Sequence, residues 1–467
     1  MKRINFLMFL LLLNTSFIFA EPVSNAPREQ ILTVEDFIRT VVEKDTAFEE
    51  ILIDQLALKY RKDLNLPARD FVLALTSQYE FNFDTNHGAP RNSVSLSRLF
   101  VRTATDVSVE YQTTPSSAFS ANSSEVTLQI SQPIAENAFG RGTALENKIV
   151  GAESEIIEYQ IIEAYEDYLA YIITAYYSWY SAYENLKIGR SSYEQSLKLL
   201  ENMNKRKASK IALPIDVNKI NIQALTKKEE LIKLQEQHDK IFNFIKQAIR
   251  YQGTELLEPA DPLSYNDREI SFEADYREFV EASRTYSALK LLEQKSSWQL
   301  KKYADDLLPS VNLILGYNAD GDDTNINNAE ETLYSGISVT WPFPGQEERA
   351  RYETSKIAKR KTEVSNRNRY VQLNTDLKNL YLQIERERKL VAITREKITL
   401  SESILESETK NYSYGKVSLN DLIMAVNEVD KNKFNEILHS VQLKILMTEW
   451  RRMTDQLISR KDIQEIK

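Results

Sequence analysis

The chain has 467 residues, with only 11 glycines and 12 prolines, so long helices are favoured over a fold of many strands and turns. It contains no cysteine, which excludes disulfides and cysteine-ligated metal centres. Its formal net charge of -9 disfavours nucleic acid as a partner.

The first twenty residues have the pattern of a secretory signal peptide, which we expect at 1–20. Lys2 and Arg3 precede a short apolar run, and Ala20 stands at the expected cleavage position. An uncleaved anchor is the alternative, but the run is too short to span a bilayer, and no later segment reaches the ~20 apolar residues that a spanning helix needs. We therefore expect an exported chain that would enter a membrane by strands rather than helices.

The first half, 21–265, is expected to contain a helix, a strand region and two long helices. Thr33 begins the first helix with a capping-box pattern, and Pro67 follows its end. From Phe71 the apolar period changes from 3.6 to 2. The predicted elements are helices at 33–65, 142–207 and 215–251 and strands within 70–133.

The second half, 266–460, repeats this order and is followed by a short tail at 461–467. Its predicted elements are helices at 272–306, 346–411 and 419–459 and strands at 310–318 and 333–342. Pro67 and Pro309 are 242 residues apart, whereas Pro133 and Pro342 are 209 apart. The first half therefore carries about thirty extra residues in its strand region, as either a longer loop or an added hairpin.

The strands have the length and pattern that a membrane β-barrel requires. Stretches of nine to eleven alternating residues cross a bilayer when tilted. Aromatic residues near the strand ends suit the two membrane interfaces: Tyr79, Phe81, Phe83, Tyr111, Tyr317, Trp341 and Phe343. Four principal strands cannot close a barrel, which needs about eight, so several copies must close it together. Three copies of four strands would give twelve.

One long helix carries an aromatic seam at steps of three and four residues. Its members are Tyr165, Tyr168, Ile172, Tyr176, Trp179 and Tyr183. The spacing is typical of packing between long helices, with a ligand-binding ladder as the alternative.

The turn Gly415–Leu422, the segment Leu308–Leu313 and the border Gln132–Ile134, in this duplicated order, resemble the TolC-type outer membrane efflux proteins over roughly residues 30–460. The resemblance implies a mainly α-helical fold with transmembrane β-strands. It implies a homotrimer, with a twelve-stranded barrel in the outer membrane of a Gram-negative bacterium and a long α-helical barrel in the periplasm. The implied function is passive export of small molecules or proteins, without cofactor or catalysis, from an inner-membrane pump through a periplasmic adaptor (membrane fusion) protein.

The resemblance also implies where the periplasmic entrance lies. Asp421 matches a family aspartate that narrows the opening, and Tyr412 matches a tyrosine that helps to hold it shut. Met424 departs from an often acidic family position. Ser418 and Asp421 also fit a plain helix cap, and both roles can hold at once. The residues expected to contact the adaptor are the two helical turns: Ile211, Ala212, Leu213, Pro214, Lys416, Val417, Ser418 and Leu419.

Two other classes of function are weaker. A periplasmic adaptor or scaffold built on one helical hairpin would not need the second strand set. An enzyme would need a reactive constellation, but the three histidines are far apart, and no phosphate-binding glycine loop or activated nucleophile is present.

Overall fold

The computed structural model describes residues 30–66, 70–83, 87–114, 123–253, 257–263, 270–321, 326 and 330–458. The expected signal peptide and C-terminal tail lie outside these residues, as does Pro67. The described chain forms two units. The helical unit takes the residues up to Ile53, 161–283 and those from Gln372 onward, and the sheet unit takes 54–160 and 284–371.

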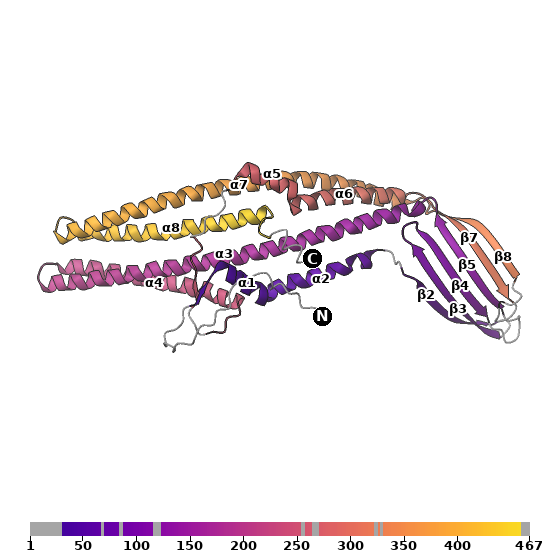
Figure 1. Cartoon of the computed structure of the whole chain (residues 1–467), viewed down its shortest axis with the longest axis horizontal. Coiled ribbons are helices and arrows are strands. Elements are labelled where there is room, and N and C mark those ends of the chain that lie inside the picture. Colours follow the sequence, from indigo (N-terminus) through magenta and orange to yellow (C-terminus); the bar gives the residue numbers. More distant parts are fainter. Residues whose placement is uncertain are drawn as a thin grey trace, which may run out of the picture. The chain divides into compact units, whose positions relative to one another are not determined.

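Eight α-helices lie in the described chain (Figure 1). They are α1 (Val34–Lys44), α2 (Thr46–Asn65), α3 (Arg141–Ala208), α4 (Pro214–Ala248), α5 (Phe272–Ala282), α6 (Arg284–Asp305), α7 (Gln346–Ser413) and α8 (Leu419–Met453). Helices α3 and α7 both have 68 residues, and α4 and α8 both have 35. This equality supports the proposal that the two halves are repeats.

Two of the expected helices are each divided by one extended residue. The helix expected over 33–65 breaks at Asp45, and the one expected over 272–306 breaks at Ser283. The Asp45 carboxylate accepts a short hydrogen bond from the Tyr168 hydroxyl of α3. Asp and Ser favour helix caps over helix interiors, and a distant partner such as Tyr168 cannot be read from a local pattern.

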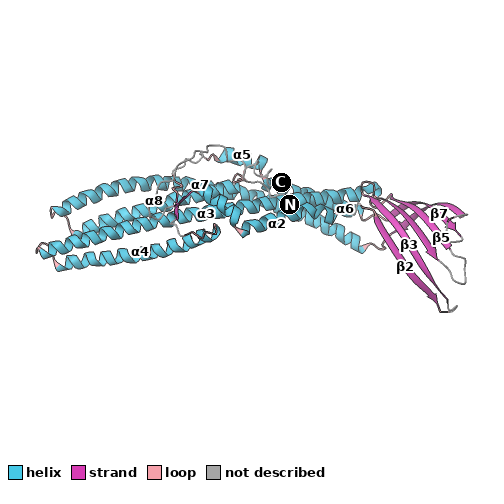
Figure 2. Cartoon of the chain, turned by 60° about the horizontal axis from the view of Figure 1, so that its bottom comes forward, coloured by secondary structure: helices cyan, strands magenta, loops and turns pink. Residues whose placement is uncertain are grey.

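The sheet unit contains one antiparallel sheet of six strands (Figures 1 and 2). Its strands, in spatial order, are β2 (Val72–Asn82), β3 (His87–Phe100), β4 (Thr105–Thr114), β5 (Ser123–Pro133), β7 (Ser310–Gly321) and β8 (Glu330–Thr340). The expectation of four principal strands per chain was therefore wrong. The extra residues of the first half form an added hairpin, β2–β3.

Strand β3 was not predicted from the sequence because its alternation of apolar and polar residues is weak. Pro90 lies inside it, and proline normally argues against a paired strand. Between Pro90 and Arg98, its more apolar face carries only two large aliphatic side chains, Val94 and Leu96. Its strand character is decided by pairing with β2 on one side and β4 on the other.

The core of the helical unit lies around the aromatic seam of α3. Tyr176 and Trp179 are fully buried against Phe37 of α1 and Ile245 of α4. The Tyr176 hydroxyl lies 2.7 Å from the carbonyl oxygen of Leu32 and 3.0 Å from that of Ala260. It thereby fastens the short parallel pair β1 (Gln30–Leu32) and β6 (Leu257–Pro259) to α3. The seam serves helix packing, as its spacing predicts.

Among the described residues, none of the helices is apolar enough over a sufficient length to cross a membrane. The same residues contain no cluster of three or more histidine, aspartate or glutamate side chains suited to holding a metal ion.

Candidate functional site: an amphipathic sheet and a helical tip

The sheet has one apolar and one polar face along its whole width. The pairing register aligns one residue from each strand in an apolar row: Leu73, Leu96, Val109, Leu128, Tyr317 and Leu333. The row next to it lies on the opposite face and, apart from Val72 at the edge, is polar or small: Val72, Ser97, Ser108, Gln129, Gly316 and Tyr334. Because side chains alternate between faces along a strand, these two rows define the two faces.

The apolar face is open within the chain. Leu73 is 63% exposed, Val109 38% and Leu333 75%, so the two edge strands and the centre are all uncovered. A continuous apolar patch of this extent does not remain in water and marks contact with a membrane or another protein. An 11-residue strand is about 36 Å long, and tilted by about 45° it covers the apolar band of about 25 Å that membrane barrels present.

The polar face carries an excess of acidic side chains. Arg91 lies 3.6 Å from Glu80 and donates to Gln112 at 3.0 Å, so this cation is already engaged. Glu125 pairs in register with Asp320, and Asp320 with Glu330, placing three carboxylates side by side on neighbouring strands. Like charges directly opposite each other are unfavourable unless water and cations screen them. This face therefore suits an aqueous space that attracts cations.

Most of the expected interface aromatics lie at the two ends of the sheet. Phe81 and Phe83 form an edge-to-face pair, with ring centroids 5.3 Å apart, where β2 ends. Trp341 and Phe343 form another at 6.0 Å directly after β8. Because β2 and β8 run in opposite directions, these pairs mark opposite rims of the sheet. Tyr79 lies near the first rim, whereas Tyr317 lies within the apolar row.

In the helical unit, the turns α3–α4 and α7–α8 pack against each other through the tip cluster, in which Met203, Val217, Ile220 and Leu419 are buried. The Tyr412 hydroxyl of α7 lies 3.2 Å from the Met203 sulfur of α3, and the Arg206 guanidinium lies 5.0 Å from the Tyr412 ring. Tyr412 therefore joins the two hairpins within one chain.

The residues expected to contact an adaptor differ in accessibility. Ile211, Leu213, Pro214, Lys416 and Ser418 are exposed, and Ala212 and Val417 are half-buried. Leu419 is buried in the tip cluster and is not accessible in this chain. The exposed part is thus mainly the apolar turn of α3–α4.

Asp421 completes a capping box at the start of α8. Its carboxylate accepts hydrogen bonds from the Ser418 backbone N–H at 2.9 Å and hydroxyl at 2.7 Å. The side-chain hydrogen bond and then the backbone one hold the pKa of Asp421 below its usual range. The capping interpretation is confirmed, and the side chain is ionised at neutral pH. Met424, on the next turn, is 62% exposed.

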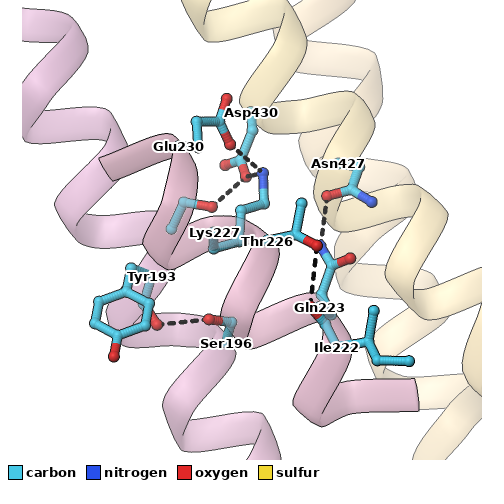
Figure 3. A network of polar contacts seen from close by, with 10 residues as sticks. Tyr193, Ser196, Ile222, Gln223, Thr226, Lys227, Glu230, Asn427 and Asp430 are labelled. Carbon is cyan, nitrogen blue, oxygen red and sulfur yellow. Dashed lines mark hydrogen bonds and ion pairs between the residues drawn. The ribbon is translucent and has the colours of Figure 1, made fainter. Parts of the chain in front are cut away.

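A buried polar network joins α3, α4 and α8 farther from the tip (Figure 3). The Lys227 ammonium lies 2.9 Å from the Asp430 carboxylate, with the side chains only 8% and 11% exposed. Asp430 also accepts a short hydrogen bond from Ser192, and Gln223 donates to Asn427 at 2.8 Å. The sequence signal for this network is a lysine at a seam position, seven residues after the buried Ile220 and three after the buried Ala224.

Helix α7 carries an exposed apolar stripe. Its members are Ile357, Val364, Val371, Leu382, Ile393, Leu400 and Ile404, which are 41–68% exposed. Steps of seven residues turn the stripe by about -20°, steps of eleven by about +20°, and the last step of four by about +40°, so these turns nearly cancel and the stripe stays on one side of the helix. A straight stripe of this kind suits packing against another helix.

Neither the protein-family models nor the curated proteins include a match to this sequence. Solved structures do match in fold. CusC has a TM-score of 0.70 at 10% identity over 92% of this chain and 95% of its own. The outer-membrane channel OprN has a TM-score of 0.70 at 14% identity over 90% of this chain and 89% of its own. The outer membrane protein VceC of Vibrio cholerae has a TM-score of 0.67 at 11% identity over 91% of this chain and 95% of its own. At these identities the likeness shows that the chain has the fold of these proteins.

Proposed function

We propose that this chain is a TolC-type outer membrane factor, one subunit of a passive channel from the periplasm to the exterior of a Gram-negative bacterium. The observation that carries this proposal is the open apolar row across six strands, backed by a polar face. The fold likeness to OprN, whose structure is described as that of an outer-membrane channel, supports it. The signal-peptide pattern of the first twenty residues supplies the export route.

The channel must be built from several copies. A six-stranded sheet is too small to close on itself, because a barrel needs about eight strands. Open edges cannot face lipid, since their backbone N–H and C=O groups would lack partners. A homotrimer, as the family resemblance implies, would close the sheets into a shared barrel and place the polar face towards the lumen.

The α7 stripe supports assembly through the helices as well. Replacing Ile393, which is 53% exposed in the single chain, by glutamate is expected to place three charges at helix interfaces and convert trimers into monomers. Size-exclusion chromatography with light scattering in mild detergent measures the change. Thr399→Glu, an exposed change on another face of α7, is the matched control and should leave the trimer intact. If the Ile393→Glu variant still forms trimers, the stripe is not part of the interface between subunits.

We propose that the tip is the periplasmic entrance, where a periplasmic adaptor protein connects the channel to an inner-membrane pump. The exposed apolar turn of Ile211 and Leu213 supports a contact with another protein there. Either small molecules in an efflux system or proteins in type I secretion can be the cargo, and transport through this subunit requires no catalysis.

Reconstitution tests this function directly. The purified protein is expected to form ion-conducting pores in planar bilayers and to appear as threefold particles in end-on images. Monomers in mild detergent that leave liposomes impermeable would overturn the proposal and favour a periplasmic scaffold protein instead.

Asp421 is expected to make the entrance cation-selective, because three carboxylates around one axis favour nearby cations. Asp421→Asn keeps an acceptor for the Ser418 N–H but removes the charge, so the cation/anion permeability ratio should fall. Ser418→Ala weakens the cap but keeps the charge and should leave the ratio unchanged. Both ratios come from reversal potentials in a salt gradient. An unchanged ratio in Asp421→Asn would leave Asp421 with its capping role alone.

A further inference from the structure

We propose that the barrel of this protein has eighteen strands, six from each of three copies, and that β8 of one copy pairs with β2 of the next. This inference rests on the proposed channel function and corrects the twelve-stranded barrel implied by the family resemblance. The twelve-stranded count assumed four strands per chain, whereas the sheet contains six.

The added hairpin has the same two faces as the rest of the sheet. Leu73 of β2 and Leu96 of β3 continue the apolar row and are 63% and 41% exposed. On the opposite face, Ala74 pairs with Ser95 and Thr76 with Ser93. A hairpin folded into the lumen or lying outside the membrane would expose this apolar face to water. Its pattern instead fits a part of the barrel in contact with lipid.

The hairpin is also firmly joined to the sheet. Strands β3 and β4 pair without a bulge through nine register positions, from Asn92 with Thr113 to Phe100 with Thr105. A twelve-stranded closure would require β4 to become an edge strand and to lose every one of these pairs. The eighteen-stranded closure keeps all of them.

The two remaining edges fit each other. Strands β2 and β8 have 11 residues each, and they run in opposite directions because the sheet is antiparallel throughout. The β8 strand of one copy therefore meets the β2 strand of the next as an antiparallel pair, and repetition of this contact closes a ring. Leu333 and Leu73 end the apolar row at the two edges, so the apolar face continues across the junction.

Both edge strands have few of the features that normally prevent a free strand edge from pairing with another chain. Neither β2 nor β8 contains proline, lysine or arginine, and both pair with their single described neighbour without a bulge. An edge built in this way is suited to pairing with another strand. Since the edges are equal in length and opposite in direction, a second copy of this chain is the occupant that fits.

The cysteine-free sequence allows a direct test by cross-linking in the full-length trimer. Ser338→Cys on β8 is combined with a cysteine at Ala74, Thr76 or Gln78 of β2, all on the polar face. The matched set combines Ser338→Cys with a cysteine at Asp106, Ser108 or Glu110 of β4. In the eighteen-stranded barrel, β4 lies three strand spacings, or about 14 Å, from the neighbouring β8. A short bismaleimide should therefore yield covalent dimers and trimers with the β2 set alone.

An end-on image gives an independent readout. Barrel diameter grows in proportion to strand number, so eighteen strands tilted by about 40° give a backbone diameter of about 35 Å, against about 23 Å for twelve. The expected diameter is thus about 1.5-fold larger. Cross-links to β4 rather than β2, or a trimer with the smaller diameter, would overturn the eighteen-stranded barrel and leave the channel function standing. Monomers without any intermolecular cross-link would overturn both.

Discussion

Val109→Arg is expected to abolish insertion and assembly of the channel. Val109 lies at the middle of β4 in the apolar row and is 38% exposed on the face assigned to lipid. An arginine at the bilayer midplane costs about 2–4 kcal/mol, so three copies lose roughly 6–12 kcal/mol. Membrane fractionation and detergent gel filtration should show the variant as aggregated or monomeric protein with little in the outer membrane.

Ser108→Arg is the matched control because it adds the same side chain one residue earlier. Ser108 lies on the opposite face, between Ser97 and Gln129 of the neighbouring strands. We expect normal insertion and trimers, because this arginine would reach an aqueous lumen. If Ser108→Arg were the damaging change and Val109→Arg the tolerated one, the assignment of the two faces would be reversed.

Asp430→Ala is expected to destabilise the helical unit by about 3–5 kcal/mol, because it leaves the Lys227 ammonium as a buried charge without its closest partner. Glu230 lies 3.3 Å from the same ammonium and is partly exposed, so the loss should fall at the lower end of this range. Urea unfolding followed by circular dichroism at the helical band measures the shift.

Two further variants separate charge burial from the loss of a hydrogen bond. Asn427→Ala removes the neutral bond from Gln223 in the same network and should cost only about 0.5–1.5 kcal/mol. The double change of Lys227→Met with Asp430→Leu replaces the ion pair by apolar side chains and should recover most of the stability. If the free energy of unfolding of Asp430→Ala equals that of the wild type, water must reach the Lys227 ammonium.

Features that depend on neighbours along the chain were predictable. Helix periodicity and the scarcity of glycine and proline are local properties, and the long helices lie close to the predicted ranges, as α3 at Arg141–Ala208 and α7 at Gln346–Ser413 show. The helix caps at Thr33 and Ser418 are local for the same reason, since the partner of each is only three residues away. Thr33 accepts a hydrogen bond from the Asp36 backbone N–H, and Ser418 forms a full capping box with Asp421. Alternation likewise predicted β7, β8 and the strand region within 70–133 that contains β2, β4 and β5.

Features that depend on partners far along the chain were decided by the tertiary structure. Strand β3 owes its conformation to β2 and β4, and the break at Asp45 involves Tyr168, 123 residues away. The seam spacing marks Lys227 as unusual, but its partner Asp430, 203 positions later, is identified only when the fold brings the two side chains together. The sequence alone determined the helices, most of the strands and the two-faced pattern, because these follow from backbone periodicity and the separation of apolar from polar side chains. Only the tertiary structure decided the six-stranded sheet and the buried ion pair, because hydrogen bonds and desolvated charges depend on which distant segments meet.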